Sequence, residues 1–226
     1  TDEVGNQDYC QTFVFTQANM GQCPVDDDPL IAGLIETEDE DPISGVEIQI
    51  NSPSGFDLNE LNNGDGSFEF PIPPGNDYTV TPVKDIDPLN GVSTFDLVLM
   101  TKHILGVNLL DSPYKMIAAD VNKSGSITTF DLVLLRKLIL FIDDDFSNNT
   151  SWRFVAKSHE FETPSNPWSE PFPEVINLNN LNSNMLNADF VAVKIGDVNG
   201  SANFAGNSDD RNNTESLVFN TKDIQV

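Results

Sequence analysis

Polar and apolar residues alternate in four short runs near the start of the chain. The runs cover residues 30–36, 46–51, 67–70 and 77–81. Turn signals separate them, with Asn63-Gly64-Asp65-Gly66 before the third run and a proline-rich stretch at 71–75 before the fourth. A period of two with frequent turns and no helical periodicity predicts a small β-sandwich of the Ig or transthyretin type over residues 30–83.

The pattern changes between residues 84 and 142. Apolar residues cover most faces of two predicted helices, at 95–105 and 130–140. Gly106 is a C-cap signal for the first helix. Ser112-Pro113 begins a short helix between them, with proline at its first position. We therefore predict a small helical module here.

The remaining segments contain scattered strand-like runs. Residues 143–201 are rich in Asn, Pro and Ser, and we predict short strands at 152–155 and 190–194 that pair with each other and pack on the helical module. Residues 1–29 hold a strand-like run at 10–17, predicted to join a neighbouring domain. Residues 202–226 read as a linker followed by a strand at 216–220. The predicted fold class is mainly β with a small α module.

The helical segment contains one motif twice. Loops at 85–96 and 120–131 lie 35 residues apart, and each ends in Phe-Asp and is followed by Leu-Val-Leu. Calcium prefers six to eight oxygen ligands, and an EF-type loop supplies them from positions 1, 3, 5, 7, 9 and 12. The second loop fits this pattern and has Gly125 at the sharp turn. Its candidate ligands are Asp120, Asn122, Ser124, Ser126, Thr128 and Asp131.

The first loop fits less regularly. Leu89 stands at position 5, where its side chain cannot bind a metal, so its carbonyl, the Asn90 side chain or a water would replace it. Its candidate ligands are Asp85, Asp87, Asn90, Gly91, Ser93 and Asp96. The alternative for both loops is a pair of Asx-rich helix N-termini without metal.

A third, partial copy lies near the end of the chain. Asp197, Asn199 and Ser201 would take positions 1, 3 and 5 of a loop, but neither a position-12 acid nor a helix follows. It is either a half-site or a plain turn. We predict two bound Ca²⁺ ions, with this half-site as a third candidate.

Two loop–helix repeats joined by a short helix resemble a dockerin, the calcium-dependent module that binds cohesin domains. The resemblance implies that loop positions 10 and 11 contact the partner, which are Thr94, Phe95, Thr129 and Phe130. The alternative is that both phenylalanines belong to the core. The preceding segment resembles carboxypeptidase-regulatory-like sandwich modules, through Ile31-Ala-Gly-Leu-Ile-Glu36 and Gly66-Ser-Phe-Glu-Phe70. This order of modules resembles that of long bacterial surface proteins.

The composition agrees with an extracellular calcium-binding protein. The 226 residues carry 36 acids against 11 bases, a net charge of −25, which repels nucleic acid and anionic membranes. No apolar run reaches the length of about 20 residues that spans a membrane. Cys10 and Cys23 would form a local disulfide in an oxidising compartment; free thiols or pairing elsewhere are the alternatives.

No catalytic pattern stands out in the sequence; the abundant Asp and Glu residues leave a carboxylate pair open, but nothing singles one out. His103 and His159 have no companions that suggest a triad or a zinc site, so we predict that the chain is not an enzyme. Our first functional hypothesis is a calcium-stabilised structural module of a bacterial surface adhesin or fibre, whose end strands pair with neighbouring domains or identical subunits. The second is a dockerin-type recognition module that binds a cohesin-like partner.

Overall fold

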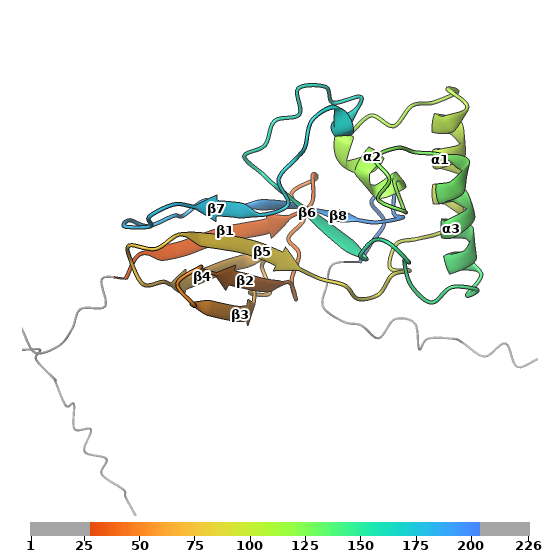
Figure 1. Cartoon of the computed structure of the whole chain (residues 1–226). Helices are drawn as coiled ribbons and strands as arrows, with labels where there is room; N and C mark the ends of the chain where they lie inside the picture. Colours follow the sequence, from red (N-terminus) through yellow and green to blue (C-terminus); the bar gives the residue numbers. More distant parts are fainter. Residues whose placement is uncertain (1–27, 204–226) are drawn as a thin grey trace, which may run out of the picture.

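Two four-stranded sheets and three short helices make up the described part of the chain. The computed structural model describes residues 28–203 (Figure 1). The predicted strands at 10–17 and 216–220 and the Cys10–Cys23 pair lie outside these residues. Within them, the prediction of a mainly β fold with a small α module is confirmed.

Each sheet of the sandwich combines strands from distant parts of the sequence. One sheet has the order β4 (Ser67–Pro71), β1 (Leu30–Glu36), β8 (Phe190–Lys194) and β6 (Trp152–Ala156). The other has the order β3 (Asp57–Leu61), β2 (Glu47–Asn51), β5 (Tyr78–Val83) and β7 (Ile176–Leu178). The β1–β8 pair is parallel and all the other strand pairs are antiparallel.

The four strands predicted within residues 30–83 are present, and β6 pairs with β8 as predicted. Two strands were missed. β3 has the sequence DLNEL and is largely exposed, so it carries no clear apolar alternation, and β7 has only three residues.

Residues 143–201 also differ from the expected irregular segment, because their strands β6, β7 and β8 are part of the two sheets. The exact domain boundaries stay a prediction.

β6 and β8 are buried on both faces. Every residue of both strands is buried. Phe154 and Phe190 belong to the sandwich core, whereas Val155 and Val193 belong to a cluster with Ile117 of helix α2 (Pro113–Ala119). The strands that complete the sandwich thus also form the surface on which the helical module packs, as Figure 1 shows.

The helices begin where the loops end. Helix α1 (Thr94–Ile104) and helix α3 (Thr129–Ile139) each start with a capping box, formed by Ser93 with Asp96 and by Thr128 with Asp131. The two helices pack side by side (Figure 1). All three predicted helices are therefore present, with boundaries within one residue of those expected for α1 and α3.

Candidate metal centre

The loop at 120–131 holds the carboxylate of Asp120 in its interior. Asp120 is fully buried, and its Oδ1 accepts a hydrogen bond from the Ser124 N–H at 2.9 Å. Its Oδ2 accepts one from the Gly125 N–H at 2.8 Å. Burial raises the pKa of Asp120; the two hydrogen bonds lower it, and the negative charge of Asp131 raises it further, with a net increase.

Asp131 closes the same loop from its other end. It is also fully buried, and its Oδ2 accepts a hydrogen bond from the Thr128 N–H at 2.8 Å. Its Oδ1 accepts one from the Asn122 N–H at 3.2 Å. Two buried negative charges in one short loop are unfavourable without a compensating cation.

The oxygen atoms of this loop fit calcium. Ser124 Oγ lies 3.3 Å from the Ser126 carbonyl oxygen and 3.4 Å from Asp120 Oδ1, so polar oxygens from positions 1, 5 and 7 come together. Within residues 28–203 no three carboxylate, imidazole or thiol side chains gather in a metal-binding group. Two carboxylates with neutral oxygens match the hard, oxygen-only ligand set that calcium prefers.

The first loop is arranged differently from the second. Asp96 is fully buried and its Oδ2 accepts a hydrogen bond from the Ser93 N–H at 2.8 Å. Its Oδ1 accepts hydrogen bonds from the backbone N–H groups of Val198 at 2.9 Å and of Asn199 at 3.3 Å. The position-12 acid of the first loop therefore contacts the predicted half-site near the end of the chain.

The two acids that start the first loop are exposed, and one of them contacts another part of the chain. Asp85 and Asp87 are exposed, and Asp85 Oδ1 accepts a hydrogen bond from the Ser151 N–H at 2.7 Å. Asn90 exchanges two hydrogen bonds with the backbone of Asn203, at 2.9 and 3.0 Å. Asp85 and Asn90 thus bind other parts of the chain, which the loop pattern did not indicate.

The half-site has a buried acid of its own. Asp197 Oδ1 accepts a hydrogen bond from the Ser201 N–H at 3.0 Å, and Oδ2 accepts one from the Ala202 N–H at 2.7 Å. Burial raises the pKa of Asp197, and the nearby charge of Asp96 raises it further against these hydrogen bonds. The sequence predicts this half-site, but it does not indicate that Asp197 lies beside Asp96.

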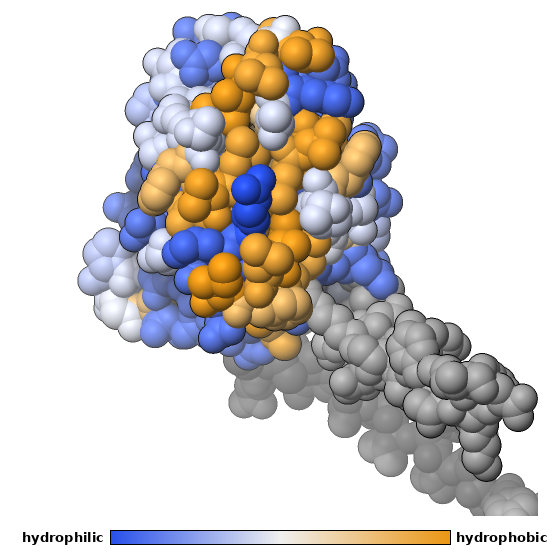
Figure 2. All heavy atoms as spheres, turned by 90° about the vertical axis from the view of Figure 1, so that its right-hand side faces the viewer, coloured by the Kyte–Doolittle hydropathy of each residue, from blue (hydrophilic) through white to orange (hydrophobic). Residues whose placement is uncertain are grey.

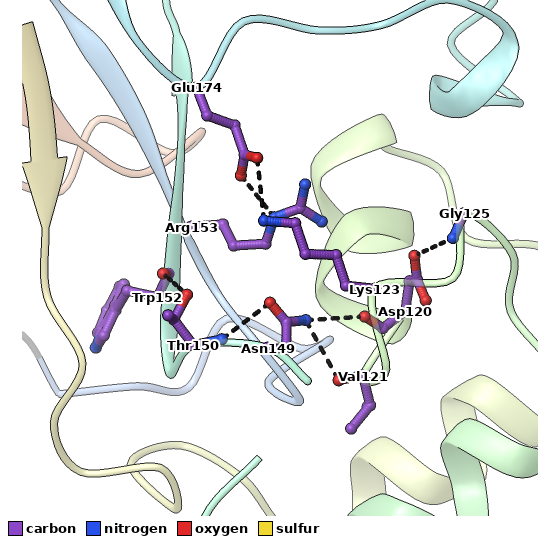
Figure 3. Close-up of polar contacts among 9 residues, drawn as sticks. All are labelled: Asp120, Val121, Lys123, Gly125, Asn149, Thr150, Trp152, Arg153 and Glu174. Carbon is purple, nitrogen blue, oxygen red and sulfur yellow. Dashed lines mark hydrogen bonds and ion pairs between the residues drawn. The ribbon is translucent and has the colours of Figure 1, made fainter. Parts of the chain in front are cut away.

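Polar side chains fasten the second loop to the sandwich (Figure 3). Asn149 Nδ2 donates to the carbonyl oxygens of Asp120 and Val121, at 3.1 and 3.3 Å. Glu174 accepts a hydrogen bond from Arg153 Nε of strand β6 at 2.7 Å and forms an ion pair with Lys123 of the loop at 3.2 Å. Burial would raise the pKa of Glu174, but the hydrogen bond and charge of Arg153, with Lys123, lower it overall.

Replacing Glu174 with glutamine should destabilise the chain in a pH-dependent way. Because the folded-state pKa of Glu174 is lowered, its contribution is complete above the unfolded pKa of about 4.5 and disappears as pH falls through the folded value. We expect a loss of about 1–2 kcal/mol at neutral pH, discounted because the side chain is one-third exposed.

Urea unfolding of both proteins across this pH range measures the difference. Glu60→Gln, at an exposed position of β3, is the matched control and should follow the wild type. A gap between E174Q and wild type that persists at the acidic end would contradict the assignment.

A second feature is the exposed face of α1 and α3. Phe95 and Phe130, 53% and 56% exposed, lie one residue after the helix starts Thr94 and Thr129. The alternative that both phenylalanines are core residues is therefore wrong. Exposed apolar residues recur at the same spacing of 35 in both repeats, as the pairs Phe95 and Phe130, Val98 and Val133, and Leu105 and Leu140. We call these six residues the apolar helix face.

Figure 2 shows that hydrophobic residues form a continuous band over this side of the molecule. A groove runs between the helices, and its lining includes Thr94 and Leu97 of α1 and Arg136 and Ile139 of α3. The apolar helix face presents the same three residue types, Phe, Val and Leu, from each helix.

Both histidines make local contacts. His103 Nδ1 accepts a hydrogen bond from the Leu110 N–H at 3.0 Å, and His159 packs edge-on against Phe161. Within the described residues, no helix is long and apolar enough to cross a membrane.

One comparison with known protein families matches the helical module. No curated protein and no solved structure matches the chain. Residues 84–140, about a quarter of the chain, match the family model of the Dockerin type I domain. Dockerins are non-catalytic modules of secreted or cell-surface proteins that bind Ca²⁺ in EF-hand-like loops and recognise cohesin domains. The part of the chain that carries both loops and all three helices is thus similar to a Dockerin type I domain.

Proposed function

We propose that this chain is a calcium-stabilised recognition segment of an extracellular protein, in which the dockerin-like module binds a cohesin partner. The observation that carries the proposal is the loop at 120–131, where two fully buried carboxylates and neutral oxygens converge in an EF-type arrangement. The family match to residues 84–140 supports the same reading.

Calcium has a structural role in this proposal. The two buried carboxylates of the loop repel each other, and a divalent cation would convert that repulsion into coordination. Because Asp131 also caps α3, ion binding and helix formation are linked. The free energy of calcium binding then adds to the free energy of folding.

The apolar helix face is the proposed docking surface. Large, exposed apolar side chains gathered on one side of a protein mark interaction sites. Here they repeat on both helices, so each half of the face presents the same pair, Thr-Phe, to a partner. We propose that the cohesin binds across the groove between α1 and α3.

A spacer function in a surface adhesin or fibre is the second candidate. It is favoured by the way β6 and β8 contact the sandwich core on one face and the helical module on the other, which joins the two parts rigidly. Strand pairing of the chain ends with neighbouring domains or subunits is part of this proposal and concerns residues outside those described.

Binding to a panel of type I cohesin modules tests the first candidate. Calorimetric titration should give a one-to-one complex in calcium that is lost after treatment with a chelator. A chain that binds calcium but none of the cohesins, and that forms filaments on its own, would favour the fibre function and contradict the recognition function.

A further inference from the structure

The feature that the proposed function leaves unexplained is a contact between two segments far apart in the sequence. The backbone N–H of Val198 donates to Asp96 Oδ1 across 102 residues. Asp96 should end the first calcium loop, yet the acids that should begin that loop, Asp85 and Asp87, are exposed and Asp85 binds Ser151. The first loop thus lacks its own first half.

We infer that the second calcium ion of the module is bound by a discontinuous loop. Residues 197–202 supply the first half of this composite loop, and residues 91–96 supply the second half. The inference rests on the proposed calcium binding by the dockerin-like module and names which residues complete its irregular site.

The first half repeats the regular loop in sequence. Residues 197–201 read Asp-Val-Asn-Gly-Ser, and residues 120–124 read Asp-Val-Asn-Lys-Ser. The fourth residue of each has a positive φ, +68° at Gly200 and +55° at Lys123. The two segments have identical residues at loop positions 1, 3 and 5, which all supply side-chain ligands in an EF-type site.

The first half also repeats the regular loop in geometry. Asp197 accepts hydrogen bonds from the N–H groups four and five residues later at 3.0 and 2.7 Å. Asp120 accepts the equivalent bonds at 2.9 and 2.8 Å. The carboxylates of Asp197 and Asp120 are therefore held in the same way.

The second half of the composite loop comes from a distant part of the sequence and continues the match. Asp96 Oδ1 accepts from the Asn199 N–H at 3.3 Å, as Asp131 Oδ1 accepts from the Asn122 N–H at 3.2 Å. Position 12 of each loop is thus linked to position 3 in the same way.

The link between positions 5 and 7 is also preserved. Ser201 Oγ donates to the Gly91 carbonyl oxygen at 2.9 Å, as Ser124 Oγ donates to the Ser126 carbonyl oxygen at 3.3 Å. Gly91 precedes Asp96 by the same interval at which Ser126 precedes Asp131. Gly91 therefore takes position 7 of the composite loop, and Ser93 takes position 9.

The Asn199 side-chain amide lies against both acids of the composite loop. One end of the amide is 2.7 Å from Asp197 Oδ1, 3.1 Å from Asp96 Oδ1 and 2.9 Å from Ser201 Oγ. If this end is the nitrogen, it donates to all three atoms and makes a metal-free contact; if it is the oxygen, a cation must lie among the carboxylates. Calcium binding distinguishes the two orientations.

The composite loop thus offers a complete oxygen ligand set. Two acids, Asp197 and Asp96, are 6% and 0% exposed. The neutral ligands follow the EF-type order, with the Asn199 amide, the Ser201 hydroxyl, the Gly91 carbonyl and Ser93 directly or through water. The ion at this site would fasten the segment that follows β8 to the start of α1.

Calorimetric titration of the chelator-treated chain with calcium tests the inference. We expect two ions per chain for the wild type. Asp197→Asn should bind one ion, at the 120–131 loop, and Asp131→Asn should bind one ion, at the composite loop. Asp85→Asn, which removes an exposed carboxylate of the contiguous first loop, is the matched control and should still bind two.

A milder variant covers the case in which Asp197→Asn fails to fold. Asn199 is exposed, so Asn199→Ala should fold and weaken one of the two sites by about tenfold, because EF-type affinity depends on the number and charge of the ligands.

The outcomes separate the inference from the proposed function. One ion in the wild type and none in D131N would overturn the composite loop while calcium binding stands. Loss of one ion in D85N but none in D197N would also overturn it, in favour of the contiguous first loop. A wild type that binds no calcium would overturn the proposed function itself.

Discussion

Asp131→Asn is expected to remove the contribution of the 120–131 loop to calcium-dependent stability. The variant keeps an oxygen that can accept the Thr128 or Asn122 N–H but loses the charge that a cation requires. At a calcium concentration one hundred times the dissociation constant, a single site stabilises the folded state by about 2.7 kcal/mol. We expect D131N to lose this amount in calcium.

In chelator the two proteins should differ far less. The remaining effect is the interaction of the carboxylate with the N-terminus of α3, about 0.3–1 kcal/mol. Urea unfolding followed by far-ultraviolet circular dichroism measures both differences. Asp111→Asn, which removes an exposed carboxylate paired with Lys115, is the control and should respond to calcium as the wild type does. An equal calcium response in D131N and wild type would refute the assignment.

The double substitution Phe95→Asp and Phe130→Asp is expected to abolish cohesin binding without unfolding the module. Both rings are more than half exposed, so their removal costs little packing. Aromatic anchors at the centre of an interface contribute 2 kcal/mol or more, so a loss of affinity of roughly 30-fold or greater is expected.

The repetition of the same exposed residues on α1 and α3 makes the single variants informative. If the partner docks in either of two orientations, each single variant keeps one intact half and should bind within about twofold of the wild type, a statistical loss of one of two modes. Leu186→Asp, at a position 61% exposed outside the apolar helix face, is the matched control. The measurement is calorimetric titration with the cohesin that binds the wild type; full binding by the double variant would exclude this face.

Local patterns predicted most of the fold. The alternation in β1, β2, β4 and β5 and the apolar helices after each loop are properties of neighbouring residues, and they were found. β3 was missed because it lies at the sheet edge and is largely exposed, so no apolar alternation was selected there. The completion of both sheets by β6, β7 and β8 depends on pairing between distant segments, which no local pattern encodes.

The same limit applies to the candidate site. The 120–131 loop is contiguous, and its first and last acids, Asp120 and Asp131, both accept hydrogen bonds from backbone N–H groups inside the loop. The first loop has an irregular position 5, and its pattern did not reveal that Asp96 faces residues 197–202. The available sequence signal was the repeated Asp-Val-Asn-x-Ser motif, and this motif does not indicate which helix it lies beside.

The position of the helical module between β5 and β6 has a mechanical consequence. β5 lies in one sheet and β6 in the other, so the chain enters the module from one sheet and returns to the other. A pulling force on a partner bound to α1 and α3 would therefore divide between two covalent connections and load the hydrogen bonds of both sheets together. A module attached at one end would transmit the same force through a single strand.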